Sequence, residues 1–117
     1  MTKKMTTFIA VCLFTTATAF ADVRMSIDNF PCQNFRNWLM ANGIANADSV
    51  ITDAKIAEIT SIDISVGWMG IGATDLTGIG FFTNLTFLNV GNNQLTWIDV
   101  SNLTNLQWLS VSNNQLT

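Results

Sequence analysis

The sequence contains no histidine and no tyrosine, and it has one proline and two cysteines among 117 residues. Without histidine, the chain lacks the side chain that most often acts as a general base near neutral pH and that commonly binds zinc. Two cysteines provide neither a disulfide framework nor a cysteine metal cluster. The composition therefore excludes histidine-based catalysis, and we assign no catalytic residue, no cofactor and no metal site.

Basic residues are also scarce, and all of them lie in the first half of the chain. The chain has five Lys and Arg against eight Asp and Glu, and Lys55 is the last basic residue. Binding to nucleic acid or to anionic lipid needs clustered Lys and Arg that neutralise phosphates. The sequence therefore predicts no nucleic-acid partner and no adhesion to an anionic membrane.

The first 21 residues are typical of a secretory signal peptide. Lys3 and Lys4 precede an apolar run over residues 8–14, and Ala19-Phe20-Ala21 fits the small-x-small pattern of a cleavage site. The run is too short to span a bilayer, so we expect no membrane span. We expect cleavage after Ala21 and a secreted or cell-surface protein, whose mature part carries a net charge of −5.

Each cysteine has two interpretations. Cys12 lies within the expected signal peptide, and a lipoprotein anchor would need a small residue before it, where Val11 stands. Cys32 is the single cysteine of the mature part, so it forms no internal disulfide. It is either an exposed thiol that pairs between chains or a small buried apolar residue, and the second is favoured.

The last third of the chain contains a repeat. Residues 83–96 and 104–117 are identical at ten of fourteen positions, at a spacing of 21 residues. Both copies follow the frame Leu-x-x-Leu-x-Val-x-x-Asn-x-Leu, which is the leucine-rich-repeat pattern. We therefore predict a mainly β fold with an α-helical N-terminal cap: a short leucine-rich-repeat solenoid with parallel β-sheets.

Alternation within the repeat assigns the two faces of its strand. Leu88 and Val90 face the core, so Phe87 and Asn89 face outward. Asn93 and its counterpart Asn114 are expected to form a structural ladder, because their amides can bond to backbone groups that a curved wall would bury unpaired. We assign these two asparagines to the scaffold rather than to a ligand.

Residues 95–101 also alternate. Ile98 and Val100 would face inward, and Trp97 and Asp99 outward. We therefore expect a second strand in each turn and a flat-sided solenoid.

The first turn of the solenoid is irregular. Residues 59–64 repeat the leucine-rich frame, so the first strand is expected there, 26 residues before the next copy. A glycine-punctuated insertion over residues 67–72 explains the longer spacing. It lacks the Lys-Ser/Thr and the helix start of a phosphate-binding loop, so we assign it no nucleotide.

Residues 22–58 are expected to form the helical cap. Pro31 suits a first helical position, Phe35 and Leu39 share one face, and Gly43 can close the end, which predicts a helix over residues 31–42. Thr52 is the expected N-cap of a second, short helix that ends near residue 58.

The loop between these helices resembles an EF-hand that has lost its ligands. Ile44, Asn46, Asp48 and Lys55 occupy the positions of four calcium ligands, and Ser49 stands in place of the turn glycine. Only two oxygen ligands survive, so we expect no calcium binding.

Over residues 27–117 the chain resembles secreted, surface-associated leucine-rich-repeat proteins of gut and oral anaerobic bacteria. The resemblance rests on Phe30-Pro-x-x-Asn34-Phe-Arg-x-x-Leu39, Ile59-Thr-Ser-Ile-Asp, Leu76-Thr-Gly-Ile-x-x-Phe82-Thr-Asn-Leu and Asn92-Asn-Gln-Leu-Thr-x-Ile-Asp-Val-Ser101. It implies an EF-hand-like or dockerin-like loop in the cap and repeats that serve adhesion or protein interaction. Relatives usually continue through further repeats, so we expect residues 59–117 to be about two and a half repeats of a truncated array.

The leading functional hypothesis is a non-catalytic extracellular module that binds a protein or a host glycan. Its candidate surface is the outward face of the repeat strands: Asp63, Phe87, Asn89, Trp108 and Ser110. Phe87 and Trp108 are expected to stack, either as a contact surface or as cross-strand packing alone. The alternatives are a structural capping fragment of a longer array and a domain of a secreted hydrolase. For the hydrolase, Asp63 and Asp99 are the only acids in the repeat frame, and we expect them on opposite sheets.

Residues 107–111 are expected to form an edge strand. Leu109, Val111 and Leu116 would face a position that no further repeat of this sequence fills. Unpaired edge groups beside exposed leucines favour pairing with another chain, so we expect self-association there.

Overall fold

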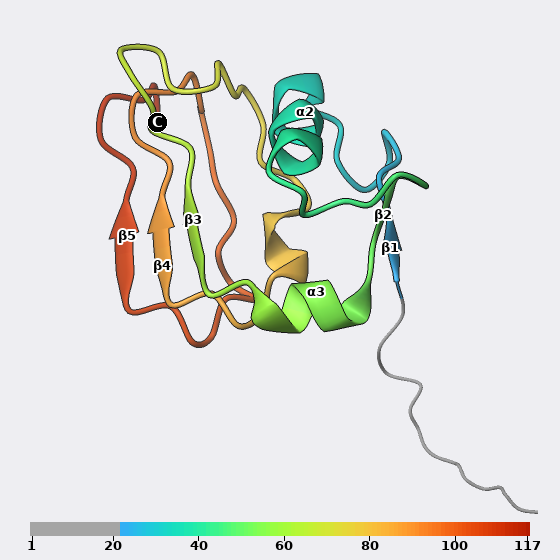
Figure 1. Cartoon of the computed structure of the whole chain (residues 1–117). Helices are drawn as coiled ribbons and strands as arrows, with labels where there is room; N and C mark the ends of the chain where they lie inside the picture. Colours follow the sequence, from blue (N-terminus) through green and yellow to red (C-terminus); the bar gives the residue numbers. More distant parts are fainter. Residues whose placement is uncertain (1–21) are drawn as a thin grey trace, which may run out of the picture.

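The computed structural model describes residues 22–117, and these form a three-stranded parallel sheet next to a small helical unit (Figure 1). The predicted signal peptide and Cys12 lie outside the described residues. Within the described part, no helix is both long enough and apolar enough to cross a membrane.

One strand from each turn builds the parallel sheet. β3 (Ser61–Asp63), β4 (Phe87–Asn89) and β5 (Trp108–Ser110) lie side by side in sequence order. Ile62 pairs with Leu88, which pairs with Leu109. The leucine-rich frame therefore places equivalent residues of successive turns at the same height, which confirms the predicted strands and their parallel arrangement.

The second strand expected in each turn is absent, and this prediction was wrong. Residues 95–101 form no strand, with a bend at Thr96 and a turn at Ser101. The carboxylate of Asp99 accepts a hydrogen bond from the Ser101 N–H at 2.9 Å, and that of Asp75 accepts one from the Thr77 N–H at 2.7 Å. Such side-chain turns bend the backbone at similar places in successive turns and break the ladder. The solenoid has its sheet on one side only.

Helix α2 (Gln33–Ala41) lies where the cap helix was predicted but begins two residues after Pro31. Cys32 is its N-cap and is extended, with φ −78° and ψ 115°, so Pro31 precedes the helix instead of starting it. Gly43 follows the helix at φ +69°, which confirms its predicted role. Phe35 and Leu39 form the buried side.

Helix α3 (Asp53–Glu58) follows the predicted N-cap. The Thr52 hydroxyl accepts a hydrogen bond from the Lys55 N–H at 3.1 Å. Just before it, β2 (Val50–Ile51) pairs antiparallel with β1 (Val23–Arg24). This two-stranded sheet was not predicted, because two residues are too few to show a strand period.

A continuous apolar core runs from the cap into the repeats. Phe30 links the two parts, with its ring 5.8 Å from that of Phe35 in α2 and 5.7 Å from that of Phe81 in the 3-10 helix η3 (Ile79–Phe81). Gly78 turns the chain at φ +105° against this cluster, and a β-carbon there would come within 2.2 Å of the Phe30 ring. The cap therefore closes the core at one end of the solenoid.

Cys32 belongs to this core and is 8% exposed. Burial raises the pKa of its thiol, but hydrogen bonds with backbone groups, those of Thr74 and Phe35 foremost, lower it further, so the pKa lies below its usual value. The exposed-thiol interpretation was wrong, and the buried interpretation is confirmed.

Candidate functional site

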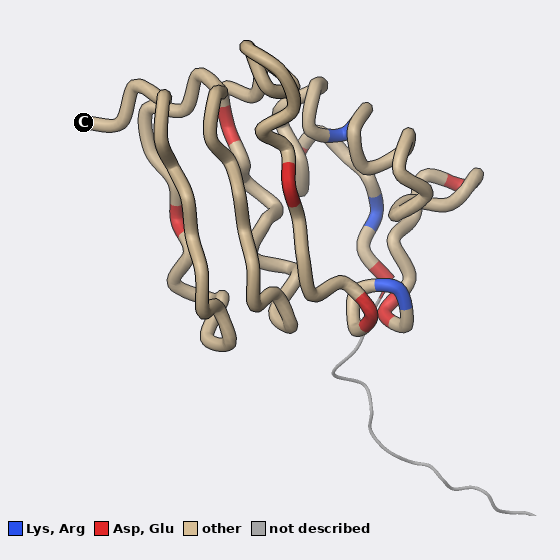
Figure 2. Tube along the Cα trace, turned by 60° about the vertical axis from the view of Figure 1, so that its left-hand side comes forward, with Lys and Arg blue, Asp and Glu red and all other residues tan. Residues whose placement is uncertain are grey.

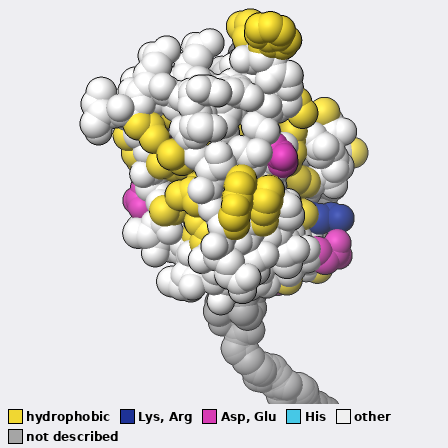
Figure 3. Space-filling model, turned by 90° about the vertical axis from the view of Figure 1, so that its left-hand side faces the viewer, with side chains coloured by type: hydrophobic (Ala, Val, Ile, Leu, Met, Phe, Trp, Pro, Cys, Tyr) yellow, Lys and Arg dark blue, Asp and Glu magenta, His cyan; other side chains and the backbone are white. Residues whose placement is uncertain are grey.

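The outward side chains of β3, β4 and β5 form one surface, which we call the sheet face. Parallel pairing aligns Ser61 with Phe87 and Trp108 in one row, and Asp63 with Asn89 and Ser110 in the next. Figure 3 views the molecule from the side of β5 and shows apolar side chains gathered among polar ones. The five residues predicted as a binding surface therefore lie together in two adjacent rows.

The aromatic pair at the centre of this face is a flat stack. The rings of Phe87 and Trp108 are 4.4 Å apart at an interplanar angle of 3°, which confirms the predicted stacking. Trp108 remains 47% exposed, whereas Phe87 is half-buried. Because stacking fixes both rings, their apolar surface is held in place before any contact forms.

The polar row is ordered by its own hydrogen bonds. The Asn89 amide donates to the Ser65 hydroxyl at 2.9 Å and lies 3.5 Å from the Asp63 carboxylate. The Ser65 hydroxyl and backbone N–H both donate to Asp63, at 2.6 and 2.9 Å. These bonds, led by that of the hydroxyl, lower the pKa of Asp63, so its carboxylate stays ionised well into the acidic range.

The sheet face carries negative charge without positive charge. Figure 2 shows the Lys and Arg residues of the described chain in the cap and none on β3, β4 or β5. Residues 59–117 contain no Lys or Arg, and Asp63 is the charged residue in the paired rows. The surface is suited to a partner that brings apolar area together with positive charge.

Asn93 and Asn114, the two asparagines of the expected ladder, bond to backbone groups at the turn that follows each strand. The buried Asn93 amide donates to the carbonyls of Ile64, Val90 and Gly91 at 2.9–3.2 Å. Its oxygen accepts from the N–H groups of Ile71 and Ala73 at 3.2 and 2.9 Å.

Asn114 repeats this arrangement one turn later. Its amide donates to the carbonyls of Val90, Val111 and Ser112, and its oxygen accepts from the Leu95 N–H at 2.9 Å. The bonds of both side chains go to backbone groups, so they hold the turns together.

The glycine-punctuated insertion carries an apolar tip that sequence reasoning did not identify as a surface feature. Trp68 is 96% exposed, and Val66 and Met69 are exposed beside it. The base of the loop is fixed, because the Asn92 amide donates to the carbonyls of Ser65 and Gly67, both at 3.2 Å. The sequence signal that could have indicated this exposed tip was a tryptophan, Trp68, in a segment bounded by Gly67 and Gly70.

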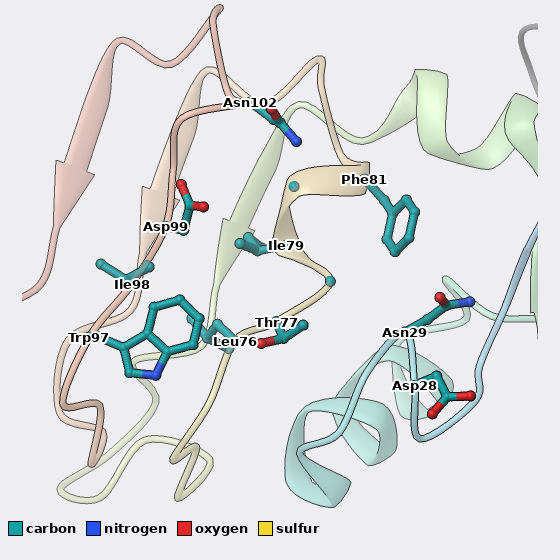
Figure 4. A pocket seen from close by; sticks show the side chains of 12 residues that line it. Asp28, Asn29, Leu76, Thr77, Ile79, Phe81, Trp97, Ile98, Asp99 and Asn102 are labelled. Atoms are coloured by element: carbon teal, nitrogen blue, oxygen red, sulfur yellow. The ribbon is translucent and has the colours of Figure 1, made fainter.

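A concave region lies on the return side of the turns, and we call it the rear groove. It has a volume of about 310 Å³. It is lined by Asp28, Asn29, Leu76, Thr77, Gly78, Ile79, Gly80, Phe81, Trp97, Ile98, Asp99 and Asn102. Figure 4 shows Trp97, Asp99 and Asn102 on one side, and Phe81, Asn29 and Asp28 on the other.

Sequence reasoning placed Trp97 and Asp99 outward but did not identify the rear groove. Both side chains are indeed exposed. The groove could not be predicted because it depends on a tertiary contact. Its opposite wall includes Asp28 and Asn29, about seventy residues earlier in the chain.

The two acids considered for a hydrolase do not share a site. Asp63 lies on β3, whereas Asp99 lies on the return segment that forms no strand, so the expectation of two opposite sheets was wrong. Asp99 has a lowered pKa because the Ser101 hydroxyl and then the Ser101 N–H donate to it. Among residues 22–117, no three His, Cys, Asp or Glu side chains come together as a metal site would require.

No family model matches the chain, and no curated protein is similar enough in sequence to count as a relative. Among solved structures, it is similar to three leucine-rich-repeat proteins of Listeria monocytogenes. The internalin InlF matches with a TM-score of 0.70 and 26% identity, over 86% of this chain and 29% of that one. For internalin C2 the values are 0.63 and 27%, over 84% and 42%. For the functional domain of InlJ, whose structure includes a cysteine ladder, they are 0.53 and 29%, over 87% and 26%.

The similarity confirms a leucine-rich-repeat fold. The chain spans between 26% and 42% of the length of these three structures. Internalins are non-enzymatic interaction proteins, which is consistent with the absence of catalysis expected from the composition.

Proposed function

We propose that this protein is a non-catalytic extracellular module that binds a protein partner through its sheet face. The observation that carries the proposal is the rigid aromatic stack of Phe87 and Trp108, with 4.4 Å between ring centroids, beside an ordered polar row. Rigid aromatic rings give large contact areas at low entropic cost and are enriched at the centres of protein interfaces. Similarity to internalins supports a protein partner.

The negative charge of the sheet face indicates the chemical character of the partner surface. Asp63 adjoins the stack, and its hydrogen bonds with Ser65 keep it ionised. No basic residue of the repeats balances it. The partner surface is therefore an apolar patch bordered by Lys or Arg, which would pair with Asp63 and cover the rings.

The exposed tip of the insertion extends this surface. Trp68 lies on the loop that follows β3, and Asn92 ties the base of that loop to the next turn. An indole that is 96% exposed adds no packing to this chain, but it contributes strongly if a partner covers it. Trp68 thus serves as a second anchor, on the loop that follows β3.

The proposal includes location and domain division. Residues 1–21 are a signal peptide removed after Ala21, residues 22–58 a cap that keeps an EF-hand-like shape, and residues 59–117 the binding repeats. The protein acts outside the cell or at its surface, in an adhesion-like role like that of repeat proteins from gut and oral anaerobes. A glycan on the sheet face is the alternative ligand, because stacked rings beside amides and hydroxyls suit a sugar as well.

An array that carries both cell-surface proteins and glycans tests the proposal. The variant replaces Phe87 and Trp108 with alanine, and Trp97→Ala is the matched control. Trp97 is 51% exposed and Trp108 47%, so each replacement removes a similar exposed ring, but from opposite sides of the turns. We expect the double variant to lose its protein signals at least tenfold, as for the removal of interface hot spots, while the control keeps them.

Three results decide between the alternatives. Loss of protein signals in the double variant alone supports the proposal. Loss of glycan signals in the double variant alone replaces the protein partner with a sugar on the same face. Protein signals that survive the double variant overturn the sheet face as the binding surface.

A further inference from the structure

The rear groove is an open concavity between the cap and the return segments of the repeats. Trp97 forms one wall and Phe81 the other, with Ile79 between them (Figure 4). Phe81 is held from behind by Phe30, whose ring lies 5.7 Å away. The groove lies where the cap meets the repeats, and Leu76 and Ile79 of its lining belong to the shared core. Its volume of about 310 Å³ is at the lower end of the range for small-molecule sites, roughly 300–1,000 Å³.

The polar groups of the groove supply both acceptors and donors. Within the described chain, the side chains of Asp28 and Asn102 form no hydrogen bond. Asn29 uses its amide N–H on the Arg24 carbonyl, which leaves its oxygen as an acceptor. Asp99 uses one oxygen on Ser101, which leaves the other. The lining also includes the Asn102 amide and the Trp97 indole N–H, which are donors and form no hydrogen bond within residues 22–117.

The lining favours a ligand that both donates and accepts hydrogen bonds. It contains two carboxylates and no Lys or Arg, so an anion would be repelled. An ammonium or guanidinium group can only donate hydrogen bonds. It would pair with the carboxylates but would make no use of the donors on Asn102 and Trp97, which are exposed to solvent.

A neutral sugar ring meets both requirements. Its hydroxyl groups donate to carboxylates and amide oxygens, and they accept from amide and indole N–H groups. Its C–H face is apolar and flat, so it packs on an aromatic ring. We infer that the rear groove binds a neutral mono- or disaccharide, with the sugar ring packed on Trp97 and its hydroxyl groups shared among Asp28, Asp99 and Asn102. This site lies on the other side of the turns from the protein-binding sheet face and is independent of it.

Gly80 provides a way to close the groove without removing a polar group. A β-carbon at Gly80 would lie 3.4 Å from the Asn102 amide nitrogen, an ordinary contact, and the backbone there does not require a positive φ. Gly80→Leu is therefore expected to fit at its β-carbon and to fill the groove beside Asn102 with the rest of its side chain.

The test uses the full chain on an array of neutral and acidic glycans, followed by titration of the strongest neutral disaccharide with tryptophan fluorescence. We expect Trp97→Ala and Gly80→Leu each to weaken binding at least about tenfold, and Trp97→Phe to weaken it less. Trp108→Ala, which removes a ring from the sheet face, is expected to leave the affinity unchanged. Thermal melts of all variants show which of them fold. If Gly80→Leu does not fold, Asn102→Ala, a change at an exposed residue, replaces it as the second groove variant.

The inference is overturned by any of three results. One is that no neutral saccharide binds, and another is that spermidine or a lysine-rich peptide binds in place of sugars and is lost in Trp97→Ala. The third is that sugar binding is lost in Trp108→Ala but kept in Trp97→Ala. The third result would also place the sugar site on the sheet face. If instead the sheet face proves not to bind a protein, the proposal of a sugar site in the rear groove is unaffected.

Discussion

The two repeat copies, residues 83–96 and 104–117, have nearly the same sequence but different surroundings. Leu88 of the first copy is fully buried, whereas Leu109 at the same position of the second is 39% exposed. Asn93 is buried, and its counterpart Asn114 is half-buried. The first copy has strands on both sides, and the second is bordered by a strand of the described chain on one side only.

The comparison separates what the pattern specifies from what the neighbours supply. The leucine-rich frame sets the strand, the inward direction of its leucines and the ladder asparagine in both copies. Burial, and with it most of the stabilising free energy, comes from the adjacent turn. Identical residues at the same position of the two copies should therefore contribute different amounts to the free energy of unfolding, and this difference can be measured.

The largest difference is expected between Leu88→Ala and Leu109→Ala. Leu88 lies in the packed core, so its truncation leaves a cavity and should lower the free energy of unfolding by about 2–5 kcal/mol. Leu109 loses less buried area, so about half of that loss or less is expected. Urea unfolding of both variants checks this. Equal losses would mean that another surface, such as a second copy of the chain, covers Leu109 in solution.

The paired change Phe87→Ala/Trp108→Ala is the control for the other face of the same strands. These rings lie on the sheet face, so their removal should lower stability less than Leu88→Ala. If the double change unfolds the protein while Leu88→Ala does not, the two faces have been assigned the wrong way round.

The next largest difference is expected between Asn93→Ala and Asn114→Ala. Removal of the buried Asn93 amide leaves the Ile71 and Ala73 N–H groups and the Ile64 and Gly91 carbonyls without this partner, while the Val90 carbonyl keeps its bond from the Asn114 amide. An unpaired buried polar group costs about 1–3 kcal/mol. At Asn114, water can reach the groups left behind, so a smaller loss is expected. Hydrogen exchange at the Ala73 and Leu95 amides would report the two sites separately, and equal acceleration would contradict the comparison.

Much of the fold follows from the sequence because repetition makes local signals explicit. Leu88, Val90 and Asn93 recur one turn later, so their inward direction and their ladder could be predicted. The register of Phe87 with Trp108 followed from the same spacing, and with it the sheet face. Thr52 was recognisable as an N-cap because its role depends on residues three positions away.

The parts that could not be predicted depend on distant residues or on side chains that bend the backbone. Alternation over residues 95–101 resembles a strand, but the bonds formed by Asp75 and Asp99 prevent pairing. The rear groove needs the cap to approach the return segment, which no local pattern encodes. Trp68 was visible in the sequence, but its exposure depends on how Asn92 fixes the loop.

A smaller difference is expected in the acid range, where two copies of the motif Asp-x-Ser also differ in their neighbours. The pKa values of Asp63 and Asp99 are both lowered below 3.8, foremost by the serine hydroxyl two residues on, and Asn89 of the next turn adds to the effect at Asp63. A carboxylate with a lowered folded-state pKa stabilises the fold above its unfolded pKa, and this contribution disappears as the pH falls through the folded value.

Stability should therefore fall slightly below about pH 4, the unfolded pKa of Asp. Asp63→Asn should reduce this acid sensitivity more than Asp99→Asn does. Thermal melts between pH 5 and pH 2.5 measure the slope for each variant. A larger change in slope for Asp99→Asn would show that the neighbouring turn does not matter at Asp63.

The smallest expected effect is none, and it concerns the loop between the two helices of the cap, which lacks the residues that would bind calcium. Ser49 adopts φ +59° at the position of the EF-hand turn glycine. The Asn46 side-chain oxygen instead accepts hydrogen bonds from the Asp48 and Val50 N–H groups at 2.9 and 3.1 Å, and Lys55 pairs with Glu58 at 3.3 Å. A calcium ion would need several ionised or carbonyl oxygens turned toward one point, and here an ammonium stands in place of the bidentate carboxylate. Millimolar calcium or EDTA should therefore leave the melting temperature unchanged, with magnesium as the control for ionic strength. A rise of several degrees in calcium alone would show that the loop rearranges to gather ligands, and would contradict the expectation drawn from its residues.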